Sequence, residues 1–310
     1  MNYRILGKTN LRVSEIGFGT WPLSGNMNGA NSYGKTDEAE SKNALRTAFI
    51  NGINFFDTAD LYGFGYVETL ISKELGEVRN DILISTKGGM INENGDTIMT
   101  SSHLFDSLNL SLKRLNTDYV DVYLLHSPFI QDITDETMET LEKMKDCGKI
   151  RYYGLSTKYV NDGLEAINKY NFEIIETNFN VLDNRCKEIG LFDLCTKFGV
   201  GLIARTPFSQ GIISGEFSYN EDKTDRRNLI PNDKYKKITT TYDNMLQHVN
   251  HKEYTKAQVA LLYCLSESSV STVIPGMKLS KEVLENCSVC GLEPLSTEEL
   301  KLINFEYKRL

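Results

Sequence analysis

Three ionisable residues, Asp57, Lys87 and His126, each stand at the end of a short apolar run that is typical of a buried strand. A fourth, Tyr62, follows Asp57 closely in the loop sequence DLYGFGYVE. In a barrel of parallel strands the carboxyl ends of all strands open into one mouth, so these side chains are expected to meet there. A carboxylate, an ammonium, an imidazole and a phenol in one mouth are the groups that general acid catalysis uses.

Tyr62 is the expected proton donor of this group. A free phenol has a pKa of about 10, and a neighbouring ammonium lowers that pKa because it stabilises the phenolate. Lys87, oriented by Asp57, is placed to supply that charge, and a neutral His126 can hydrogen-bond a substrate oxygen. The sequence therefore predicts a general acid beside a site for a carbonyl oxygen.

Two other interpretations fit the same lysine. Asp57 and Lys87 can form a salt bridge that does no more than neutralise two buried charges. A lysine at a strand end also suits an aldolase-like enzyme, in which Lys87 attacks a carbonyl carbon and forms a Schiff base. Borohydride would trap such an adduct on Lys87, whereas a role in proton transfer predicts no adduct.

Eight apolar runs alternate with amphipathic segments along the chain, which is the pattern of a parallel α/β sheet. The runs are nearly continuous in their apolar character, as expected for strands covered on both faces. They predict a single (β/α)8 TIM barrel that occupies residues 1–310 as one domain. The predicted strands cover residues 14–20, 53–58, 82–87, 120–126, 151–156, 173–179, 201–206 and 271–276.

Two segments fall outside this count of eight units. Residues 1–13 contain the turn sequence Gly7-Lys8-Thr9-Asn10 and are predicted to form a β-hairpin that plugs the amino-terminal end of the barrel. Residues 216–250 are too long and polar for an ordinary connection between strand and helix. We expect them to be a long loop after the seventh strand, placed as a flap over a ligand.

Composition limits the classes of partner. The chain has 34 Lys and Arg against 42 Asp and Glu, a net charge of −8, and neither sign is gathered in a block, which argues against nucleic acid. No run of about 18 apolar residues and no secretory leader are present, so a cytoplasmic protein without a membrane span is expected. The six cysteines are expected to be reduced, and Cys287-x-x-Cys290 lacks a second pair, so no metal site is predicted.

The segments that hold these residues resemble the aldo-keto reductase family over essentially the whole chain. The run GINFFDTADLYGFGYVETLI resembles the family segment with the catalytic Asp and Tyr, ILISTKGG the catalytic Lys strand, and DYVDVYLLHSP the catalytic His strand. The resemblance implies a reductase of an aldehyde or ketone, a small carbonyl compound or sugar, that takes hydride from NADP(H). In it Tyr62 would be the proton donor, Lys87 and Asp57 its tuning pair, and His126 the group that orients the carbonyl.

Three further segments, GKIRYYGLS, GLIARTPFSQGIISGE and VIPGMKLSKEVLEN, resemble the family's cofactor-binding segments. The resemblance implies that Phe208, Ser209 and Gly211 wrap the pyrophosphate and that Lys278 meets the 2′-phosphate. The residues expected to contact the cofactor are Gly19, Thr20, Trp21, Asp57, Ser156, Thr157, Glu176, Arg205, Thr206, Phe208, Ser209, Gln210, Gly211, Ile274, Gly276, Lys278, Glu282 and Asn286.

Three positions depart from the family's pattern. Ser156-Thr157 stands where Ser-Asn is usual, and Glu176 stands where Gln is usual, at groups that hold the nicotinamide carboxamide. An ionised Glu176 can accept a hydrogen bond from the amide NH₂ but cannot donate one to its carbonyl. Glu282 stands where Arg or Gln is common near the adenine. A looser hold on the nicotinamide ring is therefore expected, and NAD(H) stays open as the cofactor.

Aromatic residues are expected to frame the substrate. Trp21 follows the first predicted strand, Phe64 is near Tyr62, and Phe129 follows the fourth predicted strand. Together they predict an aromatic wall around a small carbonyl compound, although aromatic side chains at barrel mouths also serve ordinary packing. The sequence does not indicate the oligomeric state.

A non-catalytic interpretation also remains open, because some proteins that resemble this family are cofactor-sensing subunits of larger assemblies. Altered contacts to the carboxamide at Thr157 and Glu176 would then mean slow or absent turnover. Tight nucleotide binding without oxidation of NADPH across a panel of aldehydes would identify such a subunit.

Overall fold

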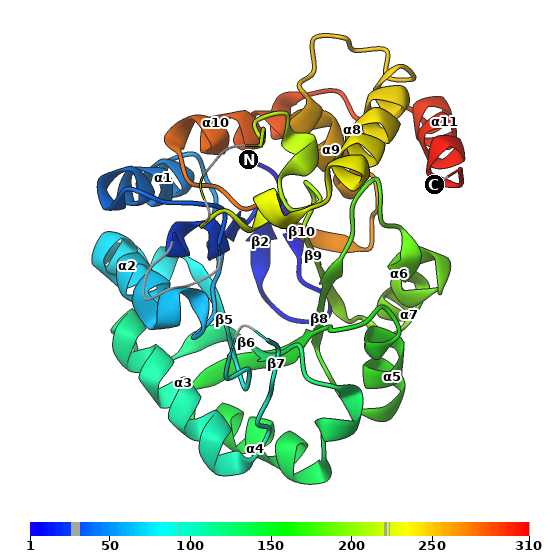
Figure 1. Cartoon of the computed structure of the whole chain (residues 1–310). Helices are drawn as coiled ribbons and strands as arrows, with labels where there is room; N and C mark the ends of the chain where they lie inside the picture. Colours follow the sequence, from blue (N-terminus) through cyan, green and yellow to red (C-terminus); the bar gives the residue numbers. More distant parts are fainter. Residues whose placement is uncertain (26–31, 93, 220–221, 223, 310) are drawn as a thin grey trace.

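The computed structural model describes residues 1–25, 32–92, 94–219, 222 and 224–309. Its centre is an eight-stranded sheet in which every neighbouring pair is parallel and the strands follow one another in chain order (Figure 1). The strands are β3 (Phe18–Gly19), β4 (Phe55–Asp57), β5 (Leu83–Gly88), β6 (Val120–His126), β7 (Ile150–Ser156), β8 (Ile174–Asn178), β9 (Gly201–Arg205) and β10 (Val270–Ile274).

The barrel closes between its first and last strands. The N–H of Gly17 donates to the carbonyl of Val273 (2.8 Å), and the N–H of Val273 donates to the carbonyl of Glu15 (2.9 Å). The predicted parallel barrel is thus confirmed. Its first strand is shorter than predicted, because residue 14 belongs to a separate hairpin and only residues 18 and 19 form β3.

Helices surround the barrel as a ring (Figure 1). Helix α3 shows why they form there, since Leu104, Leu108, Leu112 and Leu115 make one buried stripe at helical spacing. In the described part of the chain no helix is long and apolar enough to cross a membrane. The α-helices are α1 (Glu38–Ile50), α2 (Tyr66–Leu75), α3 (Ser101–Leu115), α4 (Asp135–Asp146), α5 (Asp162–Lys169), α6 (Arg185–Glu188), α7 (Leu191–Phe198), α8 (Asn232–Leu246), α9 (Lys256–Leu265), α10 (Ser280–Ser288) and α11 (Thr297–Tyr307).

Short 3-10 helices occupy several connections at the two ends of the barrel. They are η1 (Trp21–Ser24), η3 (Tyr62–Gly65), η4 (Gly76–Asp81), η5 (Ile130–Asp132), η6 (Ile212–Ser214), η7 (Arg226–Leu229) and η8 (Val289–Gly291). Of these, η1, η3, η6 and η7 follow the carboxyl ends of β3, β4 and β9, where the predicted site lies.

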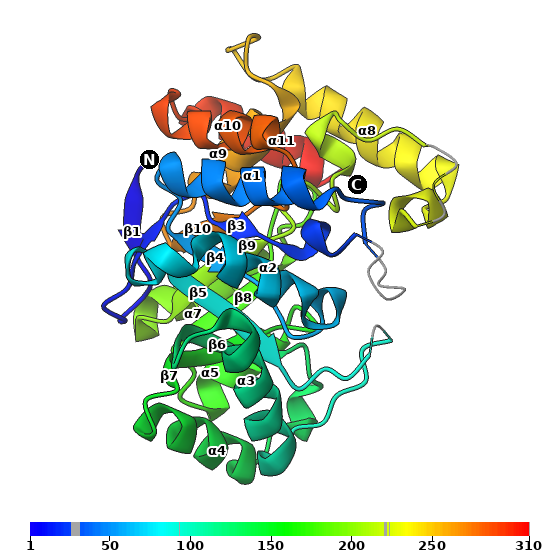
Figure 2. The same cartoon turned by 90° about the vertical axis from the view of Figure 1, so that its left-hand side faces the viewer.

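The amino-terminal hairpin forms as predicted. Strands β1 (Tyr3–Ile5) and β2 (Arg12–Ser14) pair antiparallel, and Gly7 takes the positive φ of 57° that the turn between them requires. Leu6 and Leu11 are buried in one apolar cluster with side chains of the barrel interior. Figure 2 shows the hairpin at one end of the barrel and the described parts of the connections after β3 and β5 at the other. The hairpin therefore closes the end opposite the predicted site.

Arg4 of the hairpin fastens it to the last part of the barrel. Its guanidinium donates to the carbonyls of Leu265 (3.0 Å), Glu267 (3.1 Å) and Val270 (2.7 Å). It also pairs with Glu15 at 2.7 Å. The carboxyl end of α9 is thus satisfied by a side chain from the hairpin.

The prediction of a long loop over residues 216–250 is wrong for its second half. Residues 232–246 form helix α8, because Tyr235, Ile238, Tyr242 and Met245 are spaced to make one apolar stripe, of which Tyr242 and Met245 are fully buried. The stripe was not recognised in the sequence because lysines lie between these positions. Residues 220, 221 and 223, which fell within the predicted loop, lie outside the described residues.

Candidate active site

Asp57, Lys87 and His126 end neighbouring strands β4, β5 and β6, and the structure brings them together with Tyr62 from η3. The Nζ of Lys87 donates to Oδ2 of Asp57 (2.5 Å) and to the carbonyl of Thr58 (3.1 Å). It lies 3.5 Å from the phenol oxygen of Tyr62. The rings of Tyr62 and His126 meet edge to face, with centroids 6.0 Å apart. Lys87 is completely buried, so its charge depends on these partners.

Glu176 of β8 is a second carboxylate beside the same lysine. Its Oε2 lies 3.4 Å from Nζ of Lys87, while its Oε1 accepts a hydrogen bond from Ser156 (2.8 Å). Arg205 approaches Oε1 from the end of β9 at 3.7 Å. Glu176 is 1% exposed. Glu176 was predicted to lie at the nicotinamide, whereas its contact with Lys87 was not predicted from the sequence.

Two carboxylates therefore share one buried ammonium. Burial and the neighbouring Glu176 carboxylate raise the pKa of Asp57 to about 7, against the influence of Lys87. Burial acts to lower the pKa of Lys87, but Asp57 and Glu176 outweigh it and raise that pKa above its ordinary value. Lys87 thus stays a cation, and burial together with the Glu176 charge leaves Asp57 close to taking up a proton near neutrality.

The prediction that Lys87 brings the pKa of Tyr62 below its ordinary value is wrong, because the pKa is raised overall. Burial of the phenol raises the pKa of Tyr62 to about 12, and the lowering influence of Lys87 only partly offsets it. The physical reason is that burial penalises the phenolate more than one ammonium at 3.5 Å stabilises it. The phenol is accordingly protonated at neutral pH.

His126 is held neutral. Burial, followed by the positive charges of Lys87 and Arg205, lowers the pKa of His126 well below its ordinary value. Its Nδ1 is buried and has no hydrogen-bond partner among the described residues. A neutral imidazole offers one donor and one acceptor, so His126 can serve a polar atom of a bound molecule.

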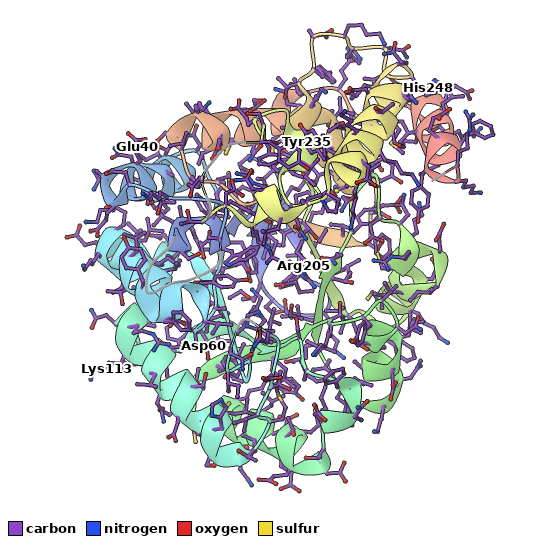
Figure 3. The ribbon with its side chains drawn as sticks, viewed as in Figure 1. Glu40, Asp60, Lys113, Arg205, Tyr235 and His248 are labelled. Atoms are coloured by element: carbon purple, nitrogen blue, oxygen red, sulfur yellow. The ribbon has the colours of Figure 1, made fainter. Side chains whose placement is uncertain are left out.

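A cleft runs from these residues across the carboxyl end of the barrel to the start of α10. It encloses about 1080 Å³ of empty space, part of which is open to solvent. In Figure 3, Arg205 lies near the middle of the ring of helices, whereas Glu40 and Lys113 lie on the outer helices. The cleft is lined by Gly19, Trp21, Pro22, Tyr33, Asp57, Tyr62, Glu176, Arg205, Thr206, Pro207, Phe208, Gln210, Gly211, Ser214, Glu216, Arg227, Ala257, Ile274, Gly276, Lys278, Glu282, Glu285 and Asn286.

Most of the residues predicted to contact a cofactor line this cleft, and four do not. Thr20 donates from its N–H and hydroxyl to the carbonyl of Asp57 and so ties β3 to β4. Ser156 binds Glu176, and Thr157 donates its hydroxyl to Thr177 (3.1 Å). Ser209 lies along a separate hollow. Thr20, Ser156 and Thr157 thus bind neighbouring protein groups instead of lining the cleft.

The predicted aromatic wall is only partly assembled at the cleft. Trp21 lines the cleft, and its ring centroid is 6.4 Å from that of Tyr62. Phe64 is 48% exposed and Phe129 is 38% exposed, and neither belongs to the lining. The Nζ of Lys158 lies 3.6 Å from the ring centre of Phe129. Of the three predicted rings, Trp21 alone lines the cleft.

The connection after β9 presents backbone donors to the cleft. Thr206, Ser209 and Gln210 have positive φ values, as does Gly211. The N–H groups of Gln210 and Gly211 find no acceptor in the described part of the chain. Consecutive N–H groups in such a turn form a concavity that suits an anion.

Arg227 of η7, which the sequence analysis did not single out, lies against this turn. A Cβ added at Gly211 would come within 2.9 Å of its Nη1. Asp225 holds the guanidinium through Nε (2.9 Å) and Nη2 (2.6 Å), and the ring of Tyr33 lies 4.9 Å from it. Because Arg227 sits in the polar excursion after β9, only the folded chain shows that it reaches the cleft.

At the far end of the cleft, Lys278 and Glu282 are joined to protein groups. The Nζ of Lys278 donates to the carbonyl of Tyr33 (2.8 Å). Oε2 of Glu282 accepts from the backbone N–H groups of Lys278 (2.6 Å) and Leu279 (3.0 Å). Asn286 is 2% exposed, and its side-chain amide makes no hydrogen bond to the described residues.

Known proteins share this fold and most of this length. A family model described as "Aldo/keto reductase family" matches residues 15–305. The chain is 30% identical to a probable voltage-gated potassium channel subunit beta of Arabidopsis thaliana, over 96% of this chain and 93% of that protein. It is 28% identical to the uncharacterized oxidoreductase YqkF of Bacillus subtilis, over 100% and 97%.

Among solved structures, the holo form of the aldo-keto reductase AKR11C1 from Bacillus halodurans superposes with a TM-score of 0.80. The two are 31% identical, and the match covers 99% of this chain and 96% of that one. The family match takes in the strand ends that carry Asp57, Lys87 and His126, together with the loop that carries Tyr62. This chain belongs to the aldo/keto reductase family.

Proposed function

We propose that this protein reduces the carbonyl group of a small aldehyde, ketone or sugar to an alcohol, with a nicotinamide dinucleotide as the source of hydride. The observation that carries the proposal is a set of side-chain contacts beside the cleft, which Tyr62 lines. There Tyr62, a protonated phenol, lies 3.5 Å from the Lys87 ammonium and edge to face with a neutral His126. Family membership supports an oxidoreductase.

The cleft suits a dinucleotide along its length. The N–H groups of Gln210 and Gly211, which have no acceptor among the described residues, and the guanidinium of Arg227 suit a pyrophosphate in its middle. The side-chain amide of Asn286 suits the polar edge of an adenine or a ribose at the far end. At the near end, Glu176 and Arg205 lie beside Tyr62, where a carboxamide needs an acceptor and a donor.

When bound, the dinucleotide supplies a hydride to the carbonyl carbon. Tyr62 transfers its phenolic proton to the carbonyl oxygen, and Lys87 stabilises the phenolate that remains because it stays charged. His126 hydrogen-bonds the carbonyl oxygen and polarises it. Asp57 fixes the position of Lys87 through the 2.5 Å contact. Trp21 closes one side of the reacting centre.

The resemblance implies NADP(H) as the nucleotide, with Lys278 at its 2′-phosphate. In the structure the ammonium of Lys278 donates to the Tyr33 carbonyl instead. The role of Lys278 as a phosphate partner stays a prediction.

The Schiff-base alternative gains no support from the geometry. A lysine must lose its proton to attack a carbonyl carbon, whereas Asp57 and Glu176 raise the pKa of Lys87. Borohydride treatment with a panel of carbonyl compounds tests it. Reductase action predicts no mass increase on Lys87, and a stable adduct there would favour the aldolase-like reaction.

The non-catalytic alternative gains weight from the potassium channel subunit beta among the relatives. It is tested together with the proposed reaction by titration with NADH and NADPH, followed by single-turnover oxidation of the bound nucleotide with an aldehyde panel. Oxidation that is lost in Tyr62→Phe supports the reductase. Tight binding with no oxidation of the nucleotide by any aldehyde would support a sensing subunit.

A further inference from the structure

We propose that the far end of the cleft selects NAD(H) over NADP(H), with Glu282 as the specificity-determining residue. The inference rests on the proposed function, because a dinucleotide with its nicotinamide at Tyr62 places its adenosine at the other end of the cleft. That end is formed by the turn after β10 and the start of α10, where Gly276, Lys278, Glu282, Glu285 and Asn286 line the wall.

The backbone donors that begin α10 are already occupied by a carboxylate. Oε2 of Glu282 accepts from Lys278 N–H at 2.6 Å and from Leu279 N–H at 3.0 Å. The start of a helix favours a negative group, and here the protein provides that group itself. A 2′-phosphate at this place would have to displace Glu282 from two hydrogen bonds or lie beside its negative charge.

The lysine at this end is also engaged. The Nζ of Lys278 donates to the Tyr33 carbonyl at 2.8 Å and so joins the turn after β10 to the segment after β3. Lys281, on the first turn of α10, is directed to Glu216 at 3.1 Å. The cations near the start of α10 thus have partners in the protein.

The remaining polar groups favour a ribose with free hydroxyls. Glu216 and Glu285 add two carboxylates to the lining at this end. A carboxylate accepts a hydrogen bond from a ribose 2′-hydroxyl, and this is how an acidic residue distinguishes NAD from NADP in other dinucleotide sites. Asn286, which is 2% exposed, also lines this end, and its side-chain amide makes no hydrogen bond to the described residues. Glu282 therefore suits a 2′-hydroxyl and opposes a 2′-phosphate.

An equilibrium titration that monitors the fluorescence of the reduced nucleotide tests the preference for NADH over NADPH without turnover. We expect the dissociation constant of NADPH to exceed that of NADH by at least about tenfold in the unmodified protein, which corresponds to about 1.4 kcal/mol. ADP-ribose and 2′-phospho-ADP-ribose, measured by calorimetry, should show the same ratio because they lack the nicotinamide and report the adenosine end alone.

Substitution of Glu282 tests whether this side chain sets the ratio of the NADPH and NADH dissociation constants. Glu282→Gln keeps an oxygen that can accept from Lys278 and Leu279 but removes the charge, so the ratio should fall at least threefold. Glu282→Arg should invert it. Glu298→Gln, which removes an exposed carboxylate from the first turn of α11, is the charge-matched control and should leave the ratio unchanged. Lys278→Met distinguishes the two assignments: a role of Lys278 at a 2′-phosphate predicts a loss mainly for NADPH, whereas selection by Glu282 predicts similar changes in both affinities.

The outcomes separate this inference from the proposed function. NADPH binding as tightly as NADH or more tightly, or an unchanged ratio in Glu282→Gln, overturns the selection while leaving the reductase intact. Binding of neither dinucleotide overturns the proposed function and the selection with it. If the Glu282 variants fail to fold, the two ADP-ribose probes on the unmodified protein still decide.

Discussion

The Nζ of Lys87 lies 3.4 Å from Oε2 of Glu176, an oxygen that is buried and has no hydrogen-bond partner among the described residues. Lys87 directs its two short hydrogen bonds to Asp57 and to the Thr58 carbonyl instead. Glu176 therefore acts on the site by its charge more than by a directed bond, and its influence falls on the other carboxylate, Asp57.

Glu176→Gln is expected to lower the pKa of Asp57, because it removes one of the two causes that raise that pKa to about 7. A carboxyl group whose pKa is higher in the folded protein contributes stability that is fully present below the pKa of the unfolded state. This stability is lost as the pH rises through the folded-state pKa, here about 7. The variant should thus lose less stability than the parent between about pH 5 and about pH 8, by roughly 1.4 kcal/mol for each pH unit by which the substitution lowers the pKa of Asp57.

Urea unfolding at the two pH values measures this difference. Glu298→Gln, an exposed carboxylate on α11, controls for the change in net charge. Equal pH dependence in Glu176→Gln and the parent would show that Glu176 does not govern Asp57.

Tyr62→Phe is expected to abolish most reductase activity while leaving nucleotide affinity within about twofold, because it deletes the proton donor and keeps the ring that packs near Trp21. General acid catalysis contributes about 10² to 10⁴-fold in rate. Single-turnover kinetics with a bound nucleotide measures the loss. Full activity with an aldehyde whose chemical step limits the rate would contradict the assignment of Tyr62.

The two directions of the reaction should respond differently to pH. With the pKa of Tyr62 raised to about 12, the phenol stays protonated near neutrality, so the rate of carbonyl reduction should not change through ionisation of Tyr62. Alcohol oxidation needs the phenolate as proton acceptor, and below the pKa its fraction rises about tenfold for each pH unit. Oxidation rates at saturating alcohol should therefore climb between about pH 7 and about pH 9. A flat oxidation profile would be inconsistent with Tyr62 as the base.

Arg227→Leu is expected to weaken NADH and NADPH binding by the same factor, because the pyrophosphate is common to both. Loss of a hydrogen bond between charged groups, about 1.5 to 3 kcal/mol, corresponds to roughly a ten- to hundredfold weaker affinity. Arg185→Leu is the matched control, since Arg185 pairs with Asp183 in the spacing that Arg227 uses with Asp225, and it does not line the cleft. Unequal losses for the two nucleotides would place Arg227 at the adenosine end.

The sequence was sufficient to predict the barrel and the meeting of Asp57, Lys87 and His126. The reason is physical: parallel strands in chain order bring successive carboxyl ends to one mouth, so position along the chain implies position in space. The position of Tyr62 at the same mouth was also predictable, because the loop that joins it to Asp57 is short. The hairpin was predictable because its turn sequence and flanking apolar residues are local features.

Other parts of the site depend on contacts between residues far apart in the sequence, which local sequence patterns do not predict. Glu176 meets Lys87 although β8 and β5 are not neighbours in the sheet, and Arg227 reaches Gly211 from a polar excursion. The sign of the Tyr62 pKa shift depended on how deeply the phenol is buried, a quantity that spacing does not report. Phe64 was predicted to line the substrate site because it is close to Tyr62 in sequence. In the structure its backbone has a positive φ of 51°, and its ring is exposed outside the cleft.

The hairpin that plugs the barrel also sets the order in which the fold can be completed. Arg4 binds the carbonyl of Leu265, 261 residues away along the chain, so its partner does not exist until most of the protein has been synthesised. Until then Leu6 and Leu11 have only part of their apolar surroundings, and the growing chain carries an uncovered interior. Closure of this barrel is therefore a late event that spans nearly the whole chain, a topology that slows folding and lengthens the time during which a nascent chain needs protection from aggregation.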